Sequence, residues 1–298
     1  MIDVSVIVLT YNPKLDKVLK TLDSIISQEG VNIQIVLADD GSVYNHFSEI
    51  KQYMIEKKFE NYKLMKSNTN VGTVKNAFYA VTECKYEYVK IISPGDCILT
   101  KKTMLKWVEH LDESKKDWSF GDAIYYREDN ERKISVKANP QNVDCYIKKK
   151  DKECIWNYVV LNDIVLGATM LCKKNVLQEY LSIIVDKVKY AEDNIFRIMM
   201  FDGKIPDYMP ENVIMYEYGV GISTSGSSTW LNKLNEDWNA TNEIIYSRAQ
   251  NTFQKEIIKQ MQIKKIKNKI KRTYMICKQK GKIKIYLKKL ILPRMTNI

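Results

Sequence analysis

The sequence predicts an α/β fold built around a mostly parallel, Rossmann-like central sheet that is flanked by helices. Over the first 92 residues, apolar β-branched runs typical of strands buried on both faces alternate with segments of helical periodicity. Polar clusters directly follow three of these runs. Ligands of such sheets bind beyond the carboxyl ends of the strands, so these clusters predict a binding site.

The order of the predicted elements supports a parallel sheet. Apolar runs predict strands at residues 4–9, 33–37, 62–65 and 88–92. Apolar residues at helical spacing predict helices at residues 15–26, 45–58 and 73–84. Strict alternation implies parallel strands joined by helical crossovers. Beyond residue 100 the pattern is less regular, with helices expected near 104–111 and 191–202, strands near 119–127, 168–172 and 213–216, and a polar, irregular segment at 128–157.

Polar residues gather where three predicted strands end. The clusters are Thr10-Tyr11-Asn12, Asp39-Asp40-Gly41-Ser42 and Ser93-Pro94-Gly95-Asp96. Alone, the second cluster is typical of a turn, because Asp and Gly favour turns. Three clusters at one sheet edge instead predict a pocket, with hydrogen-bond acceptors for a base and ribose and a carboxylate for a cation.

Five short motifs, in order and spacing, resemble those of the inverting family-2 glycosyltransferases, which have the GT-A fold. The matching segments are Val4-Ser-Val-Ile-Val-Leu-Thr-Tyr-Asn12, Ala38-Asp-Asp-Gly-Ser42, Asn70-Val-Gly72, Ser93-Pro-Gly-Asp96 and Ala191-Glu-Asp193. Each motif is weakly specific alone, and the five together span roughly residues 3–200. The resemblance implies a nucleotide-sugar-binding half at 1–100, an acceptor-binding half of the same domain at 101–225, and a loop with a basic helical tail at 226–298.

The resemblance also implies roles for individual residues. Thr10, Tyr11, Asn12, Asp39 and Asp40 would hold the nucleotide, with Asp40 accepting a hydrogen bond from the base. Asn70, Gly72 and Lys75 would close over the donor. Asp193, with Glu192 beside it, would be the general base that takes the proton from the acceptor hydroxyl. The alternative for Asp193 is a carboxylate favoured at a helix start by the macrodipole.

The metal motif departs from the family pattern. Ser93 and Gly95 stand where aspartates are usual, and only Asp96 carries a carboxylate. One carboxylate can suffice for Mg²⁺ or Mn²⁺ when substrate phosphates supply further ligands. Three roles for Asp96 therefore stay open, which are binding a divalent ion, binding ribose and capping a turn.

These features predict a hexosyl- or N-acetylhexosaminyl-transferase that inverts the anomeric centre. The expected donor is a UDP-sugar, and the expected acceptor a glycan or lipid-linked sugar in capsule, O-antigen or other surface-polysaccharide synthesis. A nucleotidyltransferase is disfavoured, because residues 9–13 do not resemble a Gly- and Lys-rich phosphate loop. A non-catalytic or differently acting nucleotide-binding protein that kept the fold is the main alternative.

A Gly/Ser-rich segment at 217–231 predicts a loop that closes over donor or acceptor. Gly219-Val-Gly221 is a poor dinucleotide motif, because it lies far from the first strand and no helix with a third glycine follows. Three aromatic residues could stack on a sugar, although aromatics belong more often to the core. They are Trp156, Tyr218 and Trp230.

The net charge of +11 is concentrated near the C-terminus. Residues 263–294 contain eleven Lys, two Arg and no acidic residue, with apolar residues at helical spacing. A basic amphipathic helix indicates membrane-surface binding. A solvated helix packed on the domain and a nucleic-acid site are the alternatives, and we favour the membrane. With no signal peptide, no membrane-spanning run and six scattered cysteines, we expect a cytoplasmic protein at the inner face of the cell membrane.

Overall fold

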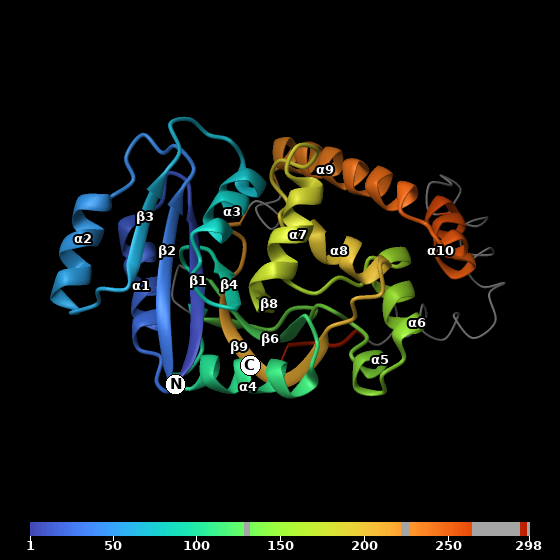
Figure 1. Cartoon of the computed structure of the whole chain (residues 1–298), viewed down its shortest axis with the longest axis horizontal. Coiled ribbons are helices and arrows are strands. Elements are labelled where there is room, and N and C mark those ends of the chain that lie inside the picture. Colours follow the sequence, from blue (N-terminus) through green and yellow to red (C-terminus); the bar gives the residue numbers. More distant parts are fainter. Residues whose placement is uncertain (128–131, 222–226, 264–292, 297–298) are drawn as a thin grey trace.

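A nine-stranded mixed sheet forms the centre of the protein (Figure 1). The computed structural model describes residues 1–127, 132–221, 227–263 and 293–296. The strands are β1 (Ile2–Thr10), β2 (Val31–Asp39), β3 (Tyr62–Lys66), β4 (Tyr88–Ile92), β5 (Cys97–Ile98), β6 (Trp118–Tyr126), β7 (Lys133–Ile134), β8 (Met170–Lys173) and β9 (Asp207–Glu217). Their order across the sheet is β3-β2-β1-β4-β8-β6-β9-β5, and β7 pairs with β6.

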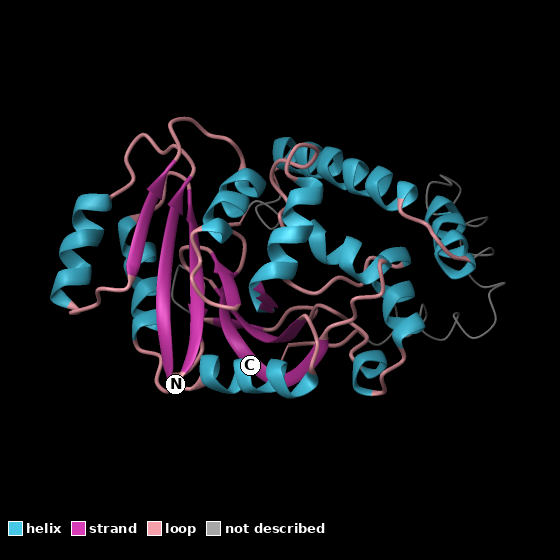
Figure 2. Ribbon diagram, in the orientation of Figure 1, coloured by secondary structure: helices cyan, strands magenta, loops and turns pink. Residues whose placement is uncertain are grey.

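Helices cover both faces of this sheet (Figure 2). One face carries α1 (Leu15–Ile26), α2 (Phe47–Glu56) and α4 (Thr103–Ser114), and the other carries α3 (Thr73–Thr82), α7 (Lys174–Ile184) and α8 (Asn194–Phe201). The remaining helices are α5 (Asp144–Ile147), α6 (Asp151–Ile155), a π-helix (Trp156–Val160), a 3₁₀-helix (Gly167–Thr169), α9 (Ser228–Ser247) and α10 (Thr252–Ile263).

The parallel half of the sheet forms as the alternating sequence pattern predicts. β1 pairs in parallel with β2 and β4, and β2 pairs in parallel with β3. The direction changes at β8, which is antiparallel to both β4 and β6. The sheet is therefore mixed, and the carboxyl ends of β1, β2 and β4 share one edge.

Side chains of β1 alternate between two hydrophobic cores. Val4, Val6 and Val8 pack with α1, α2 and α4, whereas Ile7 and Leu9 pack with α3, α7 and α8. Both sides are apolar because helices cover both faces of the sheet. The apolar residues 6–9 therefore place β1 in the interior of the sheet, with the polar residues that follow at its rim.

The expectation of an irregular polar segment at 128–157 is wrong from residue 144 onward. Residues 128–131 lie outside the described residues, but α5, α6 and the π-helix follow with buried aromatic side chains. The Trp156 indole is buried and donates a hydrogen bond to Gln260 of α10, so Trp156 is not available to stack on a sugar. Its partner lies far along the chain, so local periodicity gave no sign of this packing.

The helical parts of the C-terminal half also differ from expectation. α9 begins at Ser228, so Trp230 belongs to a helix and not to the predicted loop, whose residues 222–226 lie outside the described part. All eight residues of α8 are buried, including Asn194 and Arg197, so this helix is enclosed on every side.

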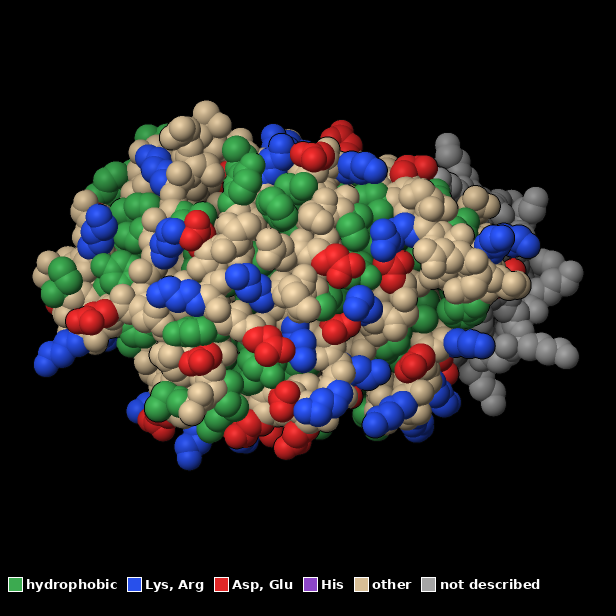
Figure 3. All heavy atoms as spheres, in the orientation of Figure 1, with side chains coloured by type: hydrophobic (Ala, Val, Ile, Leu, Met, Phe, Trp, Pro, Cys, Tyr) green, Lys and Arg blue, Asp and Glu red, His purple; other side chains and the backbone are tan. Residues whose placement is uncertain are grey.

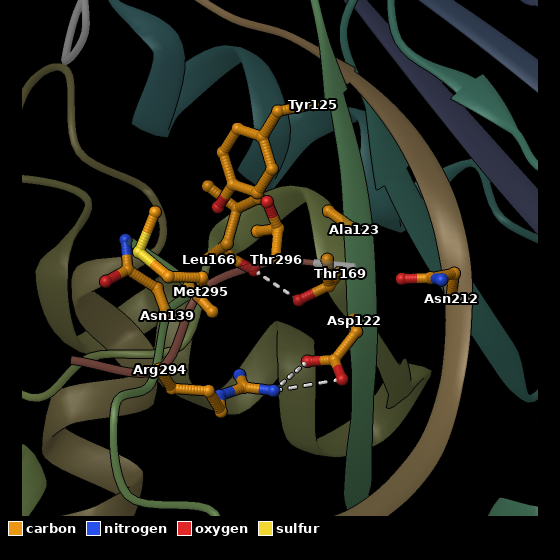
Figure 4. A pocket seen from close by; sticks show the side chains of 11 residues that line it. Asp122, Ala123, Tyr125, Asn139, Leu166, Thr169, Asn212, Arg294, Met295 and Thr296 are labelled. Atoms are coloured by element: carbon orange, nitrogen blue, oxygen red, sulfur yellow. Dashed lines mark hydrogen bonds and ion pairs between the residues drawn. The ribbon is translucent and has the colours of Figure 1, made fainter. Parts of the chain in front are cut away.

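A short C-terminal segment, residues 293–296, returns to the sheet; we call it the C-terminal clasp. The Arg294 guanidinium binds both carboxylate oxygens of Asp122 in β6, at 2.8 and 3.0 Å, and donates to the Pro140 carbonyl oxygen at 3.0 Å. Figure 4 shows this pair beside the small cavity that the clasp shares with β6 and β9. Arg294 thus belongs to the fold. In the sequence, the basic residues 264–292, which lie outside the described residues, come between α10 and the C-terminal clasp.

No helix within the described ranges combines the length and the apolar character that crossing a membrane requires. On the face shown in Figure 3, acidic and basic side chains intermingle and do not gather into a patch of one sign. The uneven charge of the chain is thus a property of the C-terminal sequence and not of this face.

Replacing Arg294 with leucine is expected to lower the free energy of unfolding by about 1–3 kcal/mol, because it leaves the partly buried Asp122 carboxylate without its cation. Urea unfolding of both proteins measures the difference. Lys106→Met serves as control, since it breaks an exposed pair with Glu211 that is worth under about 1 kcal/mol. Equal stability of Arg294→Leu and wild type would contradict a structural clasp.

Candidate active site

Asp39 ties together the ends of β1 and β2. Its carboxylate is fully buried and accepts hydrogen bonds from the Ser42 backbone N–H at 2.9 Å and from the Thr10 hydroxyl at 3.1 Å. The Asn12 backbone N–H donates to the Ser42 hydroxyl at 2.7 Å, and the Tyr11 side chain is 54% exposed. The first two polar clusters therefore form one structure, which Asp39 holds in place.

Asp40 anchors the loop that precedes α3. One carboxylate oxygen accepts the Val71 backbone N–H at 2.7 Å and the other accepts the Gly72 N–H at 3.0 Å. Burial raises the pKa of Asp40, whereas these two N–H groups favour its charged form. Asp40 thus holds the loop of the exposed Asn70, a contact that the sequence did not suggest.

Gly72 brings residues 70–72 against the loop that precedes α8; we call residues 70–72 the donor-side loop, because the family resemblance implies that they close over the donor. The Gly72 φ of +93° favours glycine, and a Cβ there would lie 2.6 Å from the Lys189 carbonyl oxygen. The same carbonyl oxygen accepts the Val74 backbone N–H at 3.1 Å. The ammonium of Lys75, which is predicted to close over the donor, lies 3.6 Å from the carboxylate of the exposed Asp186. Lys189 is the lysine that contacts Gly72.

The loop of residues 189–191 is held by a residue of α9. Asp237 is 5% exposed, and its carboxylate accepts the backbone N–H groups of Lys189 at 2.9 Å, Tyr190 at 2.7 Å and Ala191 at 3.0 Å. Glu192 and Asp193 follow directly, so α9 positions the predicted acidic motif. Nothing in the sequence around Asp237 indicated this contact.

Glu192 and Asp193 are the half-buried residues at the start of α8. Asp193 is the N-cap residue, but its side chain makes no capping hydrogen bond, which leaves its carboxylate to face Gly167. Burial raises the pKa of Asp193, and burial together with the Asp193 charge raises the pKa of Glu192 to about 8. A carboxylate with a raised pKa is a better proton acceptor near neutral pH.

Asp96 lies at the end of the β4–β5 connection and is turned into the protein. It is 6% exposed, and one of its oxygens accepts the Glu217 backbone N–H at 3.0 Å. Burial raises the pKa of Asp96 to about 7. The Glu217 carboxylate packs against Gly95 and pairs with the Lys17 ammonium at 2.8 Å. Neither Lys17 nor Glu217 was predicted as a site residue.

The described residues contain no group of three potential metal ligands. The second carboxylate oxygen of Asp96 has no hydrogen-bond partner among them. One free carboxylate oxygen fits a Mg²⁺ or Mn²⁺ ion that takes its other ligands from a diphosphate and water. It does not fit a site built from protein ligands alone.

Lys90 of β4 interacts electrostatically with both Asp96 and Glu192. It is fully buried and donates to the carbonyl oxygens of Ile91 at 2.6 Å and Ala168 at 2.7 Å. Burial lowers the pKa of Lys90 to about 7, while Asp96 and Glu192 oppose this shift. A lysine inside an apolar strand was the sequence signal that could have identified it.

The predicted residues therefore meet at one rim of the sheet. Asp40 holds the loop that contacts Lys189, and the Lys189 loop leads directly to Asp193. Lys90 lies within electrostatic reach of both Asp96 and Glu192. Asn70 and Lys75 lie at the exposed border of this region.

Comparisons with solved structures confirm the expected GT-A architecture. S. aureus TarS (residues 1–349) in complex with UDP superposes with a TM-score of 0.55 at 14% identity, over 96% of this chain and 78% of that chain. The same TarS fragment with UDP-GlcNAc gives 0.57 at 16% identity, over 88% and 72%. The mannosyltransferase PcManGT from Pyrobaculum calidifontis with GDP-Man and Mn²⁺ gives 0.61 at 14% identity, over 95% and 78%.

No curated protein matches the chain significantly. The family model described as glycosyl transferase family 2 matches residues 5–181, which is more than half of the chain. This span includes three of the five motifs in full and the first motif from its second residue onward. With these motifs at one rim of a GT-A sheet, the chain belongs to glycosyl transferase family 2.

Proposed function

We propose that this glycosyltransferase moves a hexosyl or N-acetylhexosaminyl group from a nucleoside diphosphate sugar to an acceptor hydroxyl with inversion. The main support for this proposal is the half-buried pair Glu192 and Asp193. The loop that precedes this pair contacts the donor-side loop at Gly72. The bound UDP, UDP-GlcNAc and GDP-Man of the structural neighbours support a nucleotide-sugar donor. A UDP-sugar is our first candidate.

The nucleotide would lie along the rim formed by Thr10, Tyr11, Asn12 and Asp39. Exposed Tyr11 can contact the base, while Asp39 keeps the turn in position. Asp40 holds the donor-side loop in position by accepting the Val71 and Gly72 backbone N–H groups. It would also accept the hydrogen bond from the base that the motif implies.

In the proposed reaction the acceptor oxygen forms a bond to the anomeric carbon while the bond to the diphosphate oxygen breaks. Asp193 accepts the proton of the acceptor hydroxyl, and the nucleoside diphosphate leaves on the opposite side. Mg²⁺ or Mn²⁺, held by Asp96 and the diphosphate, would stabilise the developing negative charge. The Mn²⁺ bound to PcManGT supports a divalent ion.

We further propose that the acceptor is a glycan or lipid-linked sugar of a surface polysaccharide, reached at the inner face of the cell membrane. Residues 264–292 contain eleven Lys, one Arg and no acidic residue. Each cation near an anionic leaflet contributes about 1 kcal/mol of binding. The segment is thus suited to an anionic membrane surface.

A non-catalytic nucleotide-binding protein is the second candidate, because Ser93 and Gly95 replace two carboxylates of the usual motif. Incubation with a panel of nucleotide sugars, with and without Mn²⁺, separates the two candidates. Release of nucleoside diphosphate supports the transferase, whereas binding without turnover of any donor supports the alternative.

Asp193→Asn is expected to lower the transfer rate by about 10²–10⁴-fold while the donor still binds, because the amide cannot accept the proton. In wild type the rate should rise as the pH increases from the acidic side, because Asp193 accepts a proton only in its deprotonated form and burial raises its pKa. Initial rates between pH 5.5 and 9 measure both effects. Unchanged turnover in Asp193→Asn would exclude Asp193 as the base.

Asp237→Asn is expected to reduce kcat by about tenfold or more, because a small displacement of catalytic groups is costly. Burial and the Asp193 charge are the main causes of the raised pKa of Glu192, and the Asp237 charge adds to them. Removing the Asp237 charge should therefore lower this pKa and shift the acidic limb of the pH profile to lower pH. Asp202→Asn is the control, since it removes a carboxylate that binds Arg248 at the other end of α8. Equal pH profiles for both variants would contradict a positioning role for Asp237.

Replacing lysines of the basic segment with glutamine is expected to reduce co-sedimentation with anionic vesicles, but not with neutral ones. The changes are Lys264, Lys265, Lys267 and Lys269 to Gln, which leave the C-terminal clasp intact. The matched control changes four exposed lysines elsewhere, Lys51, Lys101, Lys102 and Lys133. Equal binding of both variants to phosphatidylglycerol vesicles would rule out the membrane role of the segment.

A further inference from the structure

A cluster of two aromatic rings and two lysines lies beside the acidic motif. Tyr190, from the loop held by Asp237, meets Trp230 of α9 edge to face, with ring centroids 5.1 Å apart and an interplanar angle of 87°. The Lys233 ammonium lies 4.5 Å from the Trp230 centroid and 5.1 Å from the Tyr190 centroid. The Lys189 ammonium lies 5.4 Å from the Tyr190 centroid. We call these four side chains the aromatic–lysine cluster.

In the part of the chain that the structure describes, no carboxylate forms an ion pair with Lys189 or Lys233. The carboxylates of Asp40 and Asp237 lie near Lys189, but backbone N–H groups hydrogen-bond to both of them. Both ammonium groups lie near the Tyr190 ring, so an anion bound beside them would be stabilised by both charges.

The rings fix where these charges lie. Cation–π contact holds the long Lys233 side chain over Trp230, which lowers the conformational entropy that ligand binding must remove. Trp230 and Tyr190 are themselves only partly buried, so the cluster remains open to solvent. It therefore has the features of a preorganised anion-binding surface.

The position of the cluster identifies the substrate that it would contact. Tyr190 lies three residues before Asp193, which in the proposed function takes the proton from the acceptor. Lys189 lies against Gly72 of the donor-side loop, whereas Lys233 and Trp230 belong to α9. The nucleotide would follow the ends of β1 and β2, so Lys233, Trp230 and Tyr190 determine the assignment. We propose that the aromatic–lysine cluster is an acceptor subsite that binds a sugar carrying a negatively charged group, either a phosphate or a carboxylate. This inference rests on the proposed transferase function.

The first test needs no turnover, and it compares binding of methyl glucoside, methyl glucoside 6-phosphate and methyl glucuronide by thermal shift. The two anionic glycosides should bind wild type at least about tenfold more tightly than methyl glucoside, and added salt should weaken their binding. Comparing the affinities of methyl glucoside 6-phosphate and methyl glucuronide shows whether phosphate or carboxylate is preferred. Equal binding of all three glycosides would overturn the proposal, even if the protein proves to be a transferase.

Substitutions in the aromatic–lysine cluster test whether its side chains bind the anionic glycosides. Lys233→Gln and Trp230→Leu should each weaken binding of the anionic glycosides about tenfold, and in the transfer assay should raise KM for an anionic acceptor by a similar factor. Lys152→Gln is the matched control, because it removes a lysine that lies over the Phe253 ring, away from the acidic motif. If Lys233→Gln raises KM for the donor instead, the cluster serves the diphosphate and the acceptor assignment is wrong. Absence of nucleoside diphosphate release in wild type would refute the transferase function without affecting the binding result.

Discussion

The geometry of the site depends on two buried aspartates that bind peptide N–H groups instead of cations. Asp40 holds the loop at Gly72, Asp237 holds the loop at Lys189, and the two loops touch. Hydrogen bonds from backbone N–H groups stabilise a buried carboxylate strongly. Moving either loop would leave a buried charge without partners, so the donor-side loop and the acidic motif keep a defined relative position.

At the same rim, burial shifts the pKa values of several groups toward neutral pH. It raises the pKa of Asp96 and Glu192 and lowers the pKa of Lys90. Such shifted groups are concentrated at functional sites. With Ser93 and Gly95 in the metal motif and Glu217 paired with Lys17, the site also presents little free negative charge. A cation there would therefore depend mainly on the donor's diphosphate.

The segments before and after the basic residues 264–292 are both attached to the folded domain. The preceding helix α10 contacts the π-helix through Gln260, and Arg294 joins the following residues to β6. Both ends of the segment 264–292 are thus attached to the half of the molecule that carries α9 and the aromatic–lysine cluster. Membrane contact and acceptor binding would then involve the same half of the protein.

The sequence alone determined the parallel strands β1 to β4 and the rim at which Thr10, Asp39 and Asp96 lie, because strand periodicity and the polar residues at strand ends are local patterns. The order of the five motifs likewise identified the family, which the family model confirms. Only the tertiary structure revealed Asp237, Lys189 and the clasp, and it turned Asp96 inward. Each of these depends on contacts between residues that lie 45 or more positions apart, and no local pattern records which distant backbone group a buried carboxylate will meet.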